Sequence, residues 1–424
     1  MKTEKIHLVS LGCDKNLCDS EKILSLSLKE GYEFTDDPSE ADCIVVNTCA
    51  FILDAQQESV DTVLELSEQK KEGAKLIVTG CLAERYQDEI TKEIPEVDRV
   101  IGNKELLAYL EKEHITDRVL TTGGHFAYLK IAEGCDKHCT YCIIPSLRGA
   151  YRSVPMEDLL LEAEKLADQG VQELILVAQE TTVYGKDLYH EKKLPELLRK
   201  LSLIEGIRWI RVLYMYPEEI TDELLETVAA LPKVLPYFDM PVQHASDRIL
   251  KAMGRRTTGE EIRNRIRKIR EMIPDACLRT TLITGFPGET EDDHEILLSF
   301  IEETDFDRLG CFCYSREDGT KAAEYPDQVP EELKEARRAE IMELQQELCF
   351  RKAESRVGRT FRTIVEGRLP EEEGNIYVGR TYLDAPDVDG LIYFDAGNRD
   401  FMTGDMVDVL VTEANEYDLC GELV

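Results

Sequence analysis

Short apolar runs alternate with amphipathic, helix-like stretches through the first 317 residues of this 424-residue chain. Strands that alternate with helices predict βαβ units and parallel sheets. In the N-terminal part the apolar runs lie at 7–11, 43–47, 76–79 and 99–101. We therefore predict an open parallel α/β domain over residues 1–118.

The same alternation continues with longer strands from residue 128 to 317. Six βα units fit an incomplete (β/α)6 barrel of the TIM type, whose working face lies at the carboxyl ends of the strands. An open doubly wound sheet fits six repeats as well, and periodicity alone does not decide between the two. We place this domain at residues 119–358. The predicted strands lie at 128–133, 173–178, 207–214, 237–242, 278–284 and 309–315.

A change of pattern near residue 360 marks a third domain. Residues 331–356 are rich in helix-forming and charged residues and contain no Gly or Pro, so they predict a long, solvated connecting helix. Short β runs with Gly and Asp turns follow, and they predict a small β-barrel of the OB type over residues 359–424. The fold class is therefore an α/β multidomain protein with a C-terminal β-barrel.

The chain contains thirteen cysteines, and their explanation depends on the compartment. The start, MKTEKIHLVSLGC, has no apolar signal-peptide region, and no stretch of eighteen or more apolar residues follows. We therefore expect a cytoplasmic protein with no membrane partner. Because thiols stay reduced in the cytosol, metal or cluster ligation explains the cysteines better than disulfides.

Cys135, Cys139 and Cys142 lie in EGCDKHCTYCIIP, with the spacing CxxxCxxC. Three such thiolates can ligate three irons of a [4Fe–4S] cluster and leave the fourth iron open. S-adenosylmethionine (SAM) can chelate an open iron, and an electron from the cluster then yields a 5′-deoxyadenosyl radical. A structural zinc site is the alternative, but it needs a fourth ligand, and His138 is awkwardly placed beside Cys139. We interpret the motif as a [4Fe–4S] site that binds SAM.

Cys13, Cys49 and Cys81 each follow a predicted parallel strand. Because ligands bind outside the carboxyl ends of such strands, we expect the three side chains to converge. Gly12 and Gly80 precede two of them and allow the backbone to turn closely around a bulky ligand. We interpret this set as a second [4Fe–4S] cluster with one open iron. Buried small hydrophobic side chains are the alternative.

Further candidates for contact with SAM lie at other strand ends of the predicted barrel. The turn ITGFPGE, at 283–289, allows close approach of the backbone to a ligand, although it also fits an ordinary βα turn. The aromatic run YMYPEE, at 214–219, and His244 fit the same mouth. We assign no catalytic side chain beyond the cluster ligands. The candidates for SAM binding are Gln179, Gln243, Gly285 and Gly288; the thiols interpreted as packing residues are Cys18, Cys43, Cys277, Cys311, Cys313, Cys349 and Cys420.

The sequence resembles the methylthiotransferase family of radical SAM enzymes over essentially its whole length. The likeness is carried by SLGCDKNLCDSE, EGCDKHCTYCIIPSLRGAYRSVP, YMYPEEITDELL, MPVQHASDRILKAMGRRTT and GRTYLDAPDVDG. It implies an N-terminal methylthiotransferase domain, a radical SAM barrel and a C-terminal TRAM domain. It also implies that the barrel cluster generates the radical, that the N-terminal cluster holds the sulfur species, and that a second SAM supplies the methyl group.

Within this family the sequence is most similar to the branch that methylthiolates the β-carbon of an aspartate in the twelfth small-subunit ribosomal protein. The alternative branch modifies an adenosine of tRNA and tends to have PVQSGS where this chain has PVQHAS, at 241–246. Cys18 departs from the valine common in the family. It is an alternative ligand or, as the simpler interpretation, a small hydrophobic substitution.

Charge also favours a protein substrate. The formal net charge is −34, and residues 359–424 carry five Arg and no Lys against fifteen Asp and Glu. RNA binding requires clustered positive charge, so nucleic acid is disfavoured as a direct substrate. We expect a monomer that binds a basic ribosomal protein through its acidic TRAM domain. The sequence does not identify the electron donor or the sulfur source.

Overall fold

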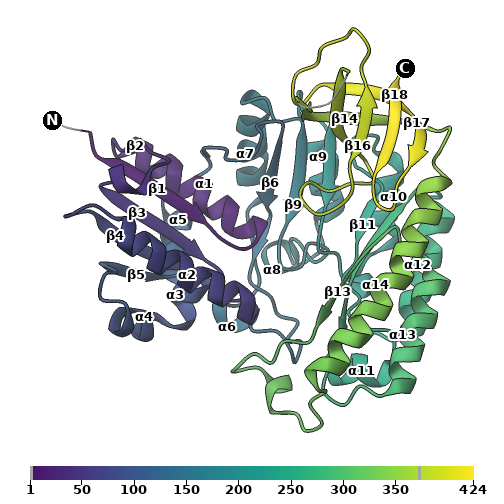
Figure 1. Ribbon diagram of the computed structural model, residues 1–424, viewed down its shortest axis with the longest axis horizontal. Coiled ribbons are helices and arrows are strands. Elements are labelled where there is room, and N and C mark those ends of the chain that lie inside the picture. The colour runs from purple at the N-terminus through teal and green to yellow at the C-terminus, as the bar shows by residue number, and fades with distance from the viewer. Residues whose placement is uncertain (1–2, 371–373) are drawn as a thin grey trace.

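The computed structural model describes residues 3–370 and 374–424, and its N-terminal part is an α/β unit with a parallel sheet (Figure 1). The strand order is β2-β1-β3-β4-β5, so the order reverses between β1 and β3. Central β3 is buried along its whole length, as its apolar and β-branched residues require. Ligands of open α/β sheets bind where the order reverses, at the carboxyl ends. The strands are β1 (Lys5–Ser10), β2 (Glu33–Phe34), β3 (Cys43–Thr48), β4 (Lys75–Gly80) and β5 (Arg99–Gly102).

Helix α1 (Asp14–Lys29) connects this unit with the barrel that follows. Its Cys18 thiol donates to the carbonyl oxygen of Tyr128 at 3.4 Å, and its Lys22 pairs with Glu162 at 2.9 Å. The helix begins directly after Cys13. The other helices of the unit are η1 (Pro38–Glu40), α2 (Leu53–Gln69), α3 (Cys81–Arg85), α4 (Gln87–Glu93) and α5 (Asn103–Lys112).

Six parallel strands then follow one another in space in the order of the sequence. The first three form one sheet and the last three another, and the bridge between Ile210 and Val234 joins them. An order without reversal is that of a partial (β/α) barrel and not of a doubly wound sheet, which confirms the predicted barrel. The strands are β6 (Phe126–Lys130), β9 (Glu173–Val177), β10 (Trp209–Val212), β11 (Tyr237–Asp239), β12 (Cys277–Thr284) and β13 (Arg308–Cys313).

Helices cover the outer face of this barrel (Figure 1). Two of the longer ones, α12 (Gly259–Met272) and α13 (Glu291–Thr304), begin with complete capping boxes at Thr258 and Thr290, which satisfy their first backbone N–H groups. The remaining elements are the pair β7 (Ala132–Glu133) and β8 (Arg152–Ser153) with α6 (Ile144–Arg148), α7 (Met156–Asp168), α8 (Lys186–Tyr189), α9 (Leu194–Leu201), η2 (Pro217–Glu219), α10 (Asp222–Ala230), α11 (Asp247–Ala252), α12 (Gly259–Met272), α13 (Glu291–Thr304) and η3 (Lys321–Glu324).

Helix α14 (Glu331–Glu354) was predicted as a solvated connector, and that description is incomplete. One stripe of the helix, at spacings of three and four residues, is buried, with Ile341 fully enclosed. The burial of this stripe could not be predicted from the sequence because several of its residues are polar and make buried contacts. For example, Gln345 donates to the carbonyl of Phe306 at 3.1 Å. The stripe consists of Lys334, Arg337, Ile341, Gln345, Leu348, Cys349 and Ala353.

The C-terminal strands close into a five-stranded barrel, which confirms the predicted OB-like domain. A buried ion pair joins it to the central barrel: Glu173 pairs with Arg380 of the C-terminal barrel at 2.7 Å and also accepts from Arg211 of its own barrel at 2.8 Å. None of the helices in the described ranges is long and apolar enough to span a bilayer. The strands are β14 (Thr360–Arg368), β15 (Ile376–Thr381), β16 (Ile392–Asp395), β17 (Met406–Ala414) and β18 (Leu419–Leu423).

Candidate functional site

The cysteines of the barrel motif lie in one loop between β7 and α6. Cys135 and Cys139 are buried and Cys142 is half-buried. Burial raises the pKa of Cys135 to about 11 and that of Cys142 to about 12, and the nearby Cys139 thiol raises both pKa values further. The structure therefore brings the three thiols together in a site from which water is largely excluded. We call Cys135, Cys139 and Cys142 the barrel set.

The other three cysteines come from three different strand ends. Cys13 precedes α1, Cys49 follows β3, and Cys81 begins α3 directly after β4. A Cβ added at Gly12, where φ is +84°, would lie 2.5 Å from the Cβ of Cys49, so the loop that carries Cys13 touches the second cysteine. Burial raises the pKa of Cys81 to about 11, with contributions from the Cys13 and Cys49 thiols. The structure thus gathers all three, which we call the N-terminal set.

The spacing within both sets fits a cluster better than a single ion. Zinc binds sulfur at about 2.3 Å, so two sulfur ligands of one zinc lie at most about 4.6 Å apart. Within residues 3–370 and 374–424, three Cys, His, Asp or Glu ligand atoms lie within 4.8 Å of one another only at Cys313, Glu331 and Glu335. In each set at least one pair of sulfur atoms therefore lies more than 4.8 Å apart, which is wider than one zinc ion spans and compatible with a larger iron–sulfur cubane. An all-thiol donor set also suits iron–sulfur ligation.

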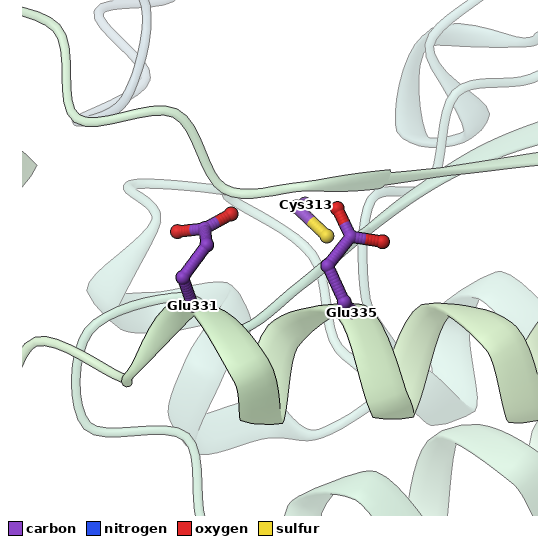
Figure 2. Close-up of side chains that lie close together, drawn as sticks. All are labelled: Cys313, Glu331 and Glu335. Atoms are coloured by element: carbon purple, nitrogen blue, oxygen red, sulfur yellow. The ribbon is translucent and has the colours of Figure 1, made fainter.

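Figure 2 shows the closely spaced group, with Cys313 on β13 and the two glutamates on α14. Glu331 pairs with Lys334 at 2.9 Å and Glu335 with Arg338 at 2.8 Å, so both carboxylates already have a cationic partner. Burial and then Glu335 raise the pKa of Cys313 to about 11, which keeps the thiol protonated. We assign no metal to this group.

Buried polar atoms without hydrogen-bond partners gather beside the barrel set. In the described residues they include Oε2 of Glu180, Oε2 of Glu218, and Nε and Nη1 of Arg255. The guanidinium of Arg255 lies over the ring of Tyr216 at 4.1 Å, and the Tyr216 hydroxyl is 3.7 Å from the sulfur of Cys139. Within the described ranges the two carboxylate oxygens have only long ion-pair contacts, at 3.7 Å from Lys137 and from Nη2 of Arg255. Buried polar groups without a hydrogen bond are costly, so this cluster suits a ligand that carries both amino and carboxylate groups. SAM has both.

These side chains extend the sequence-based candidates for SAM binding. Tyr216 and Glu218 belong to the aromatic run YMYPEE, which the sequence placed at the barrel mouth. Glu180 and Arg255 were missed, although Glu180 directly follows the predicted candidate Gln179. Burial raises the pKa of Glu180 to about 7, against the opposing effect of Lys137. A carboxyl group that titrates near neutrality at a barrel mouth is typical of functional sites.

The four predicted SAM contacts differ in their surroundings. Gln179 donates to Glu133 at 2.9 Å, and its side-chain oxygen has no partner among the described residues. Gln243 has a left-handed φ of +71°. A Cβ at Gly285 would lie 2.2 Å from Cγ of Lys334, so this glycine makes room for α14, whereas Gly288 has its nearest side-chain atom at 3.8 Å. Their role toward SAM stays a prediction.

His244 and Cys18 are both fully buried. The backbone N–H of Ser246 donates to Nδ1 of His244. The other ring nitrogen of His244, Nε2, lies 3.5 Å from a carboxylate oxygen of Glu289. Cys18 faces a barrel strand and lies outside the N-terminal set, and burial raises its pKa to about 12. These contacts agree with the packing interpretation of Cys18.

Charged and aromatic side chains lie between the two sets, and of these only Tyr214, in the run YMYPEE, was a sequence-based candidate. Nζ of Lys15 lies 3.5 Å from the ring centre of Tyr214 and 2.8 Å from Asp14. Tyr214 has a left-handed φ of +58°, which is strained for an aromatic residue. Arg148 and Asn16, both buried, lie next to the N-terminal set. Contacts between residues this distant in the chain leave no periodic signal in the sequence.

Comparisons with known proteins cover all three parts of the chain. A family model described as uncharacterized protein family UPF0004 matches residues 5–102, that of the Radical SAM superfamily matches 129–301, and that of the TRAM domain matches 357–424. Among solved structures, the radical SAM methyltransferase TsrM from Kitasatospora setae, with cobalamin and a [4Fe–4S] cluster bound, has a TM-score of 0.55 at 14% identity over 88% of this chain and 82% of that chain. This likeness shows a shared fold.

Curated relatives are similar over their full length. The ribosomal protein uS12 methylthiotransferase RimO of Lachnoclostridium phytofermentans is 54% identical over 98% of this chain and 99% of the relative. RimO of Acetivibrio thermocellus is 49% identical over 99% and 98%, and RimO of Clostridioides difficile is 46% identical over 99% of both chains. The chain therefore belongs to the RimO family of radical SAM methylthiotransferases.

Proposed function

We propose that this enzyme methylthiolates the β-carbon of an aspartate in ribosomal protein uS12. The proposal rests on one structural observation above all: two separate sets of three thiols, each at the carboxyl ends of parallel strands, lie in one chain. A two-part reaction that both activates a carbon and inserts sulfur needs two such sites. The curated relatives named as uS12 methylthiotransferases support the choice of substrate.

We assign one [4Fe–4S] cluster to the barrel set, together with SAM, and a second [4Fe–4S] cluster to the N-terminal set. When bound, these groups supply the radical that removes hydrogen, the sulfur that is inserted and, from SAM, the methyl group. The protein holds both sets away from water, since Cys49, Cys81, Cys135 and Cys139 are all buried. Exclusion of water protects reactive species from side reactions.

Side chains at the barrel mouth are proposed to hold SAM. The guanidinium atoms of Arg255 that lack a hydrogen bond would donate to its carboxylate, and the oxygens of Glu180 and Glu218 that lack one would accept from its amino group. Tyr216 would lie between Arg255 and Cys139, and its ring would fix the orientation of the Arg255 guanidinium stacked on it. Of the four sequence-based candidates, Gln179 is the best supported. Its side-chain oxygen has no hydrogen-bond partner in the described part of the chain, and its side-chain nitrogen donates to Glu133, which lies two residues before Cys135.

The acidic C-terminal barrel is proposed to bind the basic substrate. Its described acidic side chains are mostly exposed and outnumber the four exposed arginines, while the fifth arginine, Arg380, is buried in ion pairs with Glu173 and Glu366. An acidic surface attracts a basic protein and repels the phosphates of tRNA, so charge disfavours the tRNA alternative. The exposed acidic residues are Asp387, Asp395, Asp400, Asp405, Asp408, Glu413, Glu416 and Glu422.

We further propose domain boundaries near residues 118 and 358, action as a monomer and a cytoplasmic location. The family match that begins at residue 357 supports the second boundary to within a few residues, and the match over 129–301 lies inside the proposed central domain. The ribosomal substrate supports the location.

The substrate is tested by offering the anaerobically prepared enzyme, SAM and a reductant either recombinant uS12 or tRNA. Mass spectrometry should find a methylthio addition on an aspartate of uS12, and the matched Cys49→Ala variant should produce none. A methylthio group on tRNA adenosine, with uS12 unmodified, would contradict the proposal.

A further inference from the structure

A chain of buried polar side chains links the two cysteine sets, and the proposed reaction gives these side chains no chemical step. Its centre is Arg148, at the end of α6, whose side chain is 1% exposed. Nη1 of Arg148 donates to both carboxylate oxygens of Glu133 at 3.0 Å, and Nη2 donates to the side-chain oxygen of Asn16. Arg148 belongs to the barrel, whereas Asn16 belongs to α1 of the N-terminal unit.

Asn16 holds two of the loops that carry the N-terminal set. Its side-chain N–H groups donate to the carbonyl of Leu11 at 2.9 Å and to the carbonyl of Thr48 at 3.0 Å. Leu11 lies two residues before Cys13, and Thr48 directly precedes Cys49. The amide group has two N–H donors and both are used, while its oxygen accepts from Arg148. One buried side chain thus ties together the backbones next to two proposed ligands.

Arg148 also lies close to the third loop. Its buried guanidinium is near the thiol of Cys81, the proposed ligand at the start of α3. Arg148 therefore adjoins the N-terminal set both through Asn16 and with its own charged head group.

The other end of the chain meets the barrel set. Glu133 precedes Gly134 and Cys135, and its Oε1 accepts from the backbone N–H of Gly134 at 3.3 Å. Nζ of Lys130 donates to the same carboxylate at 2.8 Å. Glu133 thus accepts hydrogen bonds from two buried cationic side chains, Arg148 and Lys130. Buried charge-assisted hydrogen bonds of this kind fix geometry.

We propose that Glu133, Arg148 and Asn16 form a positioning relay through which the barrel holds the N-terminal cysteine set in the arrangement that binds iron. The inference rests on the proposed N-terminal cluster and extends it, because retention of that cluster then depends on an arginine from the other domain. Arg148 and Asn16 are positioning residues and touch neither substrate nor SAM in this account. Side chains that orient ligands from behind typically affect metal affinity by about 10- to 100-fold.

The test uses the full chain with Cys135, Cys139 and Cys142 changed to alanine, so that all bound iron belongs to the N-terminal set. Arg148→Met in this background should weaken iron retention against a chelator by about 10- to 100-fold. Arg148→Lys keeps the charge but lacks the planar fork, so it should recover only part of the loss.

Arg118→Met is the matched control, because Arg118 is equally buried and also bridges α1 to the barrel, through Glu21 and Glu162. It lacks contact with either cysteine set among the described residues. The control should retain iron as the parent does. Equal loss of iron from Arg118→Met and Arg148→Met would overturn the relay in favour of general destabilisation of the interface.

A second variant and a second measurement keep the inference testable if Arg148→Met fails to fold. Asn16→Asp preserves size and the bond to Arg148 but cannot donate to the carbonyls of Leu11 and Thr48. In the cluster-free full chain it should speed hydrogen exchange at residues 11–13 and 48–50, whereas Arg118→Met should not. Unchanged exchange and unchanged iron retention would refute the relay. A parent that binds no iron would instead refute the N-terminal cluster and, with it, the relay.

Discussion

The two cysteine sets reach similar arrangements by different routes. The barrel set comes from one loop of eight residues, 135–142, whereas the N-terminal set is collected from three strand ends spread over residues 13–81. A local loop carries its ligand spacing in the sequence itself. A dispersed set depends on strand order, on close packing at glycines and on side chains from elsewhere. The N-terminal set should therefore be the more sensitive to substitutions outside its own ligands.

The largest effect is expected from removing one ligand of each set. Cys139→Ala should abolish deoxyadenosine production and leave the N-terminal iron in place. Cys49→Ala should leave SAM cleavage measurable but stop methylthiolation, because the proposed sulfur site is lost. Chromatography of the SAM products and mass spectrometry of uS12 separate the two outcomes. Full deoxyadenosine production by Cys139→Ala, or methylthiolation by Cys49→Ala, would remove the assigned division of roles.

A substitution in the contact with the C-terminal barrel tests whether the N-terminal set responds to any loss of stability. Glu173→Gln leaves Arg211 and Arg380 buried without their common anion, which should lower the free energy of unfolding by about 3–5 kcal/mol. Urea unfolding of the cluster-free chain measures this. Iron retention by the N-terminal set in the folded variant should match that of the parent. Selective loss of that iron would instead show that the set responds to a general loss of stability.

The same pair has a defined pH dependence. Despite burial, Arg380 and Arg211 lower the pKa of Glu173 below its usual 4.5, so the folded state favours the ionised form. The contribution to stability is complete above about pH 4.5 and is lost as the pH falls toward the lowered value. The difference in unfolding free energy between the parent and Glu173→Gln should therefore shrink below pH 4.5. A difference that stays constant down to pH 3 would contradict the ion-pair assignment.

Gly12→Ala should damage the N-terminal set without touching a ligand. The backbone at Gly12 is left-handed, and the new Cβ would lie 2.5 Å from that of Cys49. Left-handed strain and overpacking together should cost about 2–4 kcal/mol. Loss of iron is expected from the N-terminal set only, measured by iron analysis in the background lacking barrel cysteines. Gly31→Ala, where φ is also positive but nothing lies within 4 Å, is the control for backbone strain alone.

The smallest effect is expected at the surface of the C-terminal barrel. Changing Asp400, Asp405 and Asp408 to lysine should weaken binding of uS12 mainly through slower association, by about tenfold at low salt and less at high salt. Surface plasmon resonance at two salt concentrations measures both. Association that is unaffected at low salt would remove the electrostatic basis for substrate choice, while both cysteine sets would keep their assignments.

Periodicity was sufficient to predict the main strands and the partial barrel. The predicted strand at 43–47 corresponds to β3 (Cys43–Thr48), and that at 278–284 to β12 (Cys277–Thr284). These elements are predictable because alternation and apolar runs are local properties. The buried stripe of α14 was not, because polar residues such as Gln345 occupy it and their partners are distant in the chain.

The candidate site divides in the same way. The six cysteines could be selected because their spacing or their place after a strand is visible in the sequence. Arg148 and Asn16 could not, because their hydrogen bond joins residues 132 positions apart. Glu180 was missed for a different reason: burial is the main cause that raises its pKa to about 7, and the burial of a single carboxyl group cannot be predicted from its sequence neighbours.

Iron and sulfide content per chain tests the central claim, that one chain carries two separate cluster sites. The protein is purified and reconstituted anaerobically, and both elements are quantified together with zinc. Two [4Fe–4S] clusters predict about eight irons per chain, and about four in either set of triple cysteine-to-alanine variants. Four irons in the unaltered protein, all lost with the barrel set, or zinc in place of iron, would contradict the account.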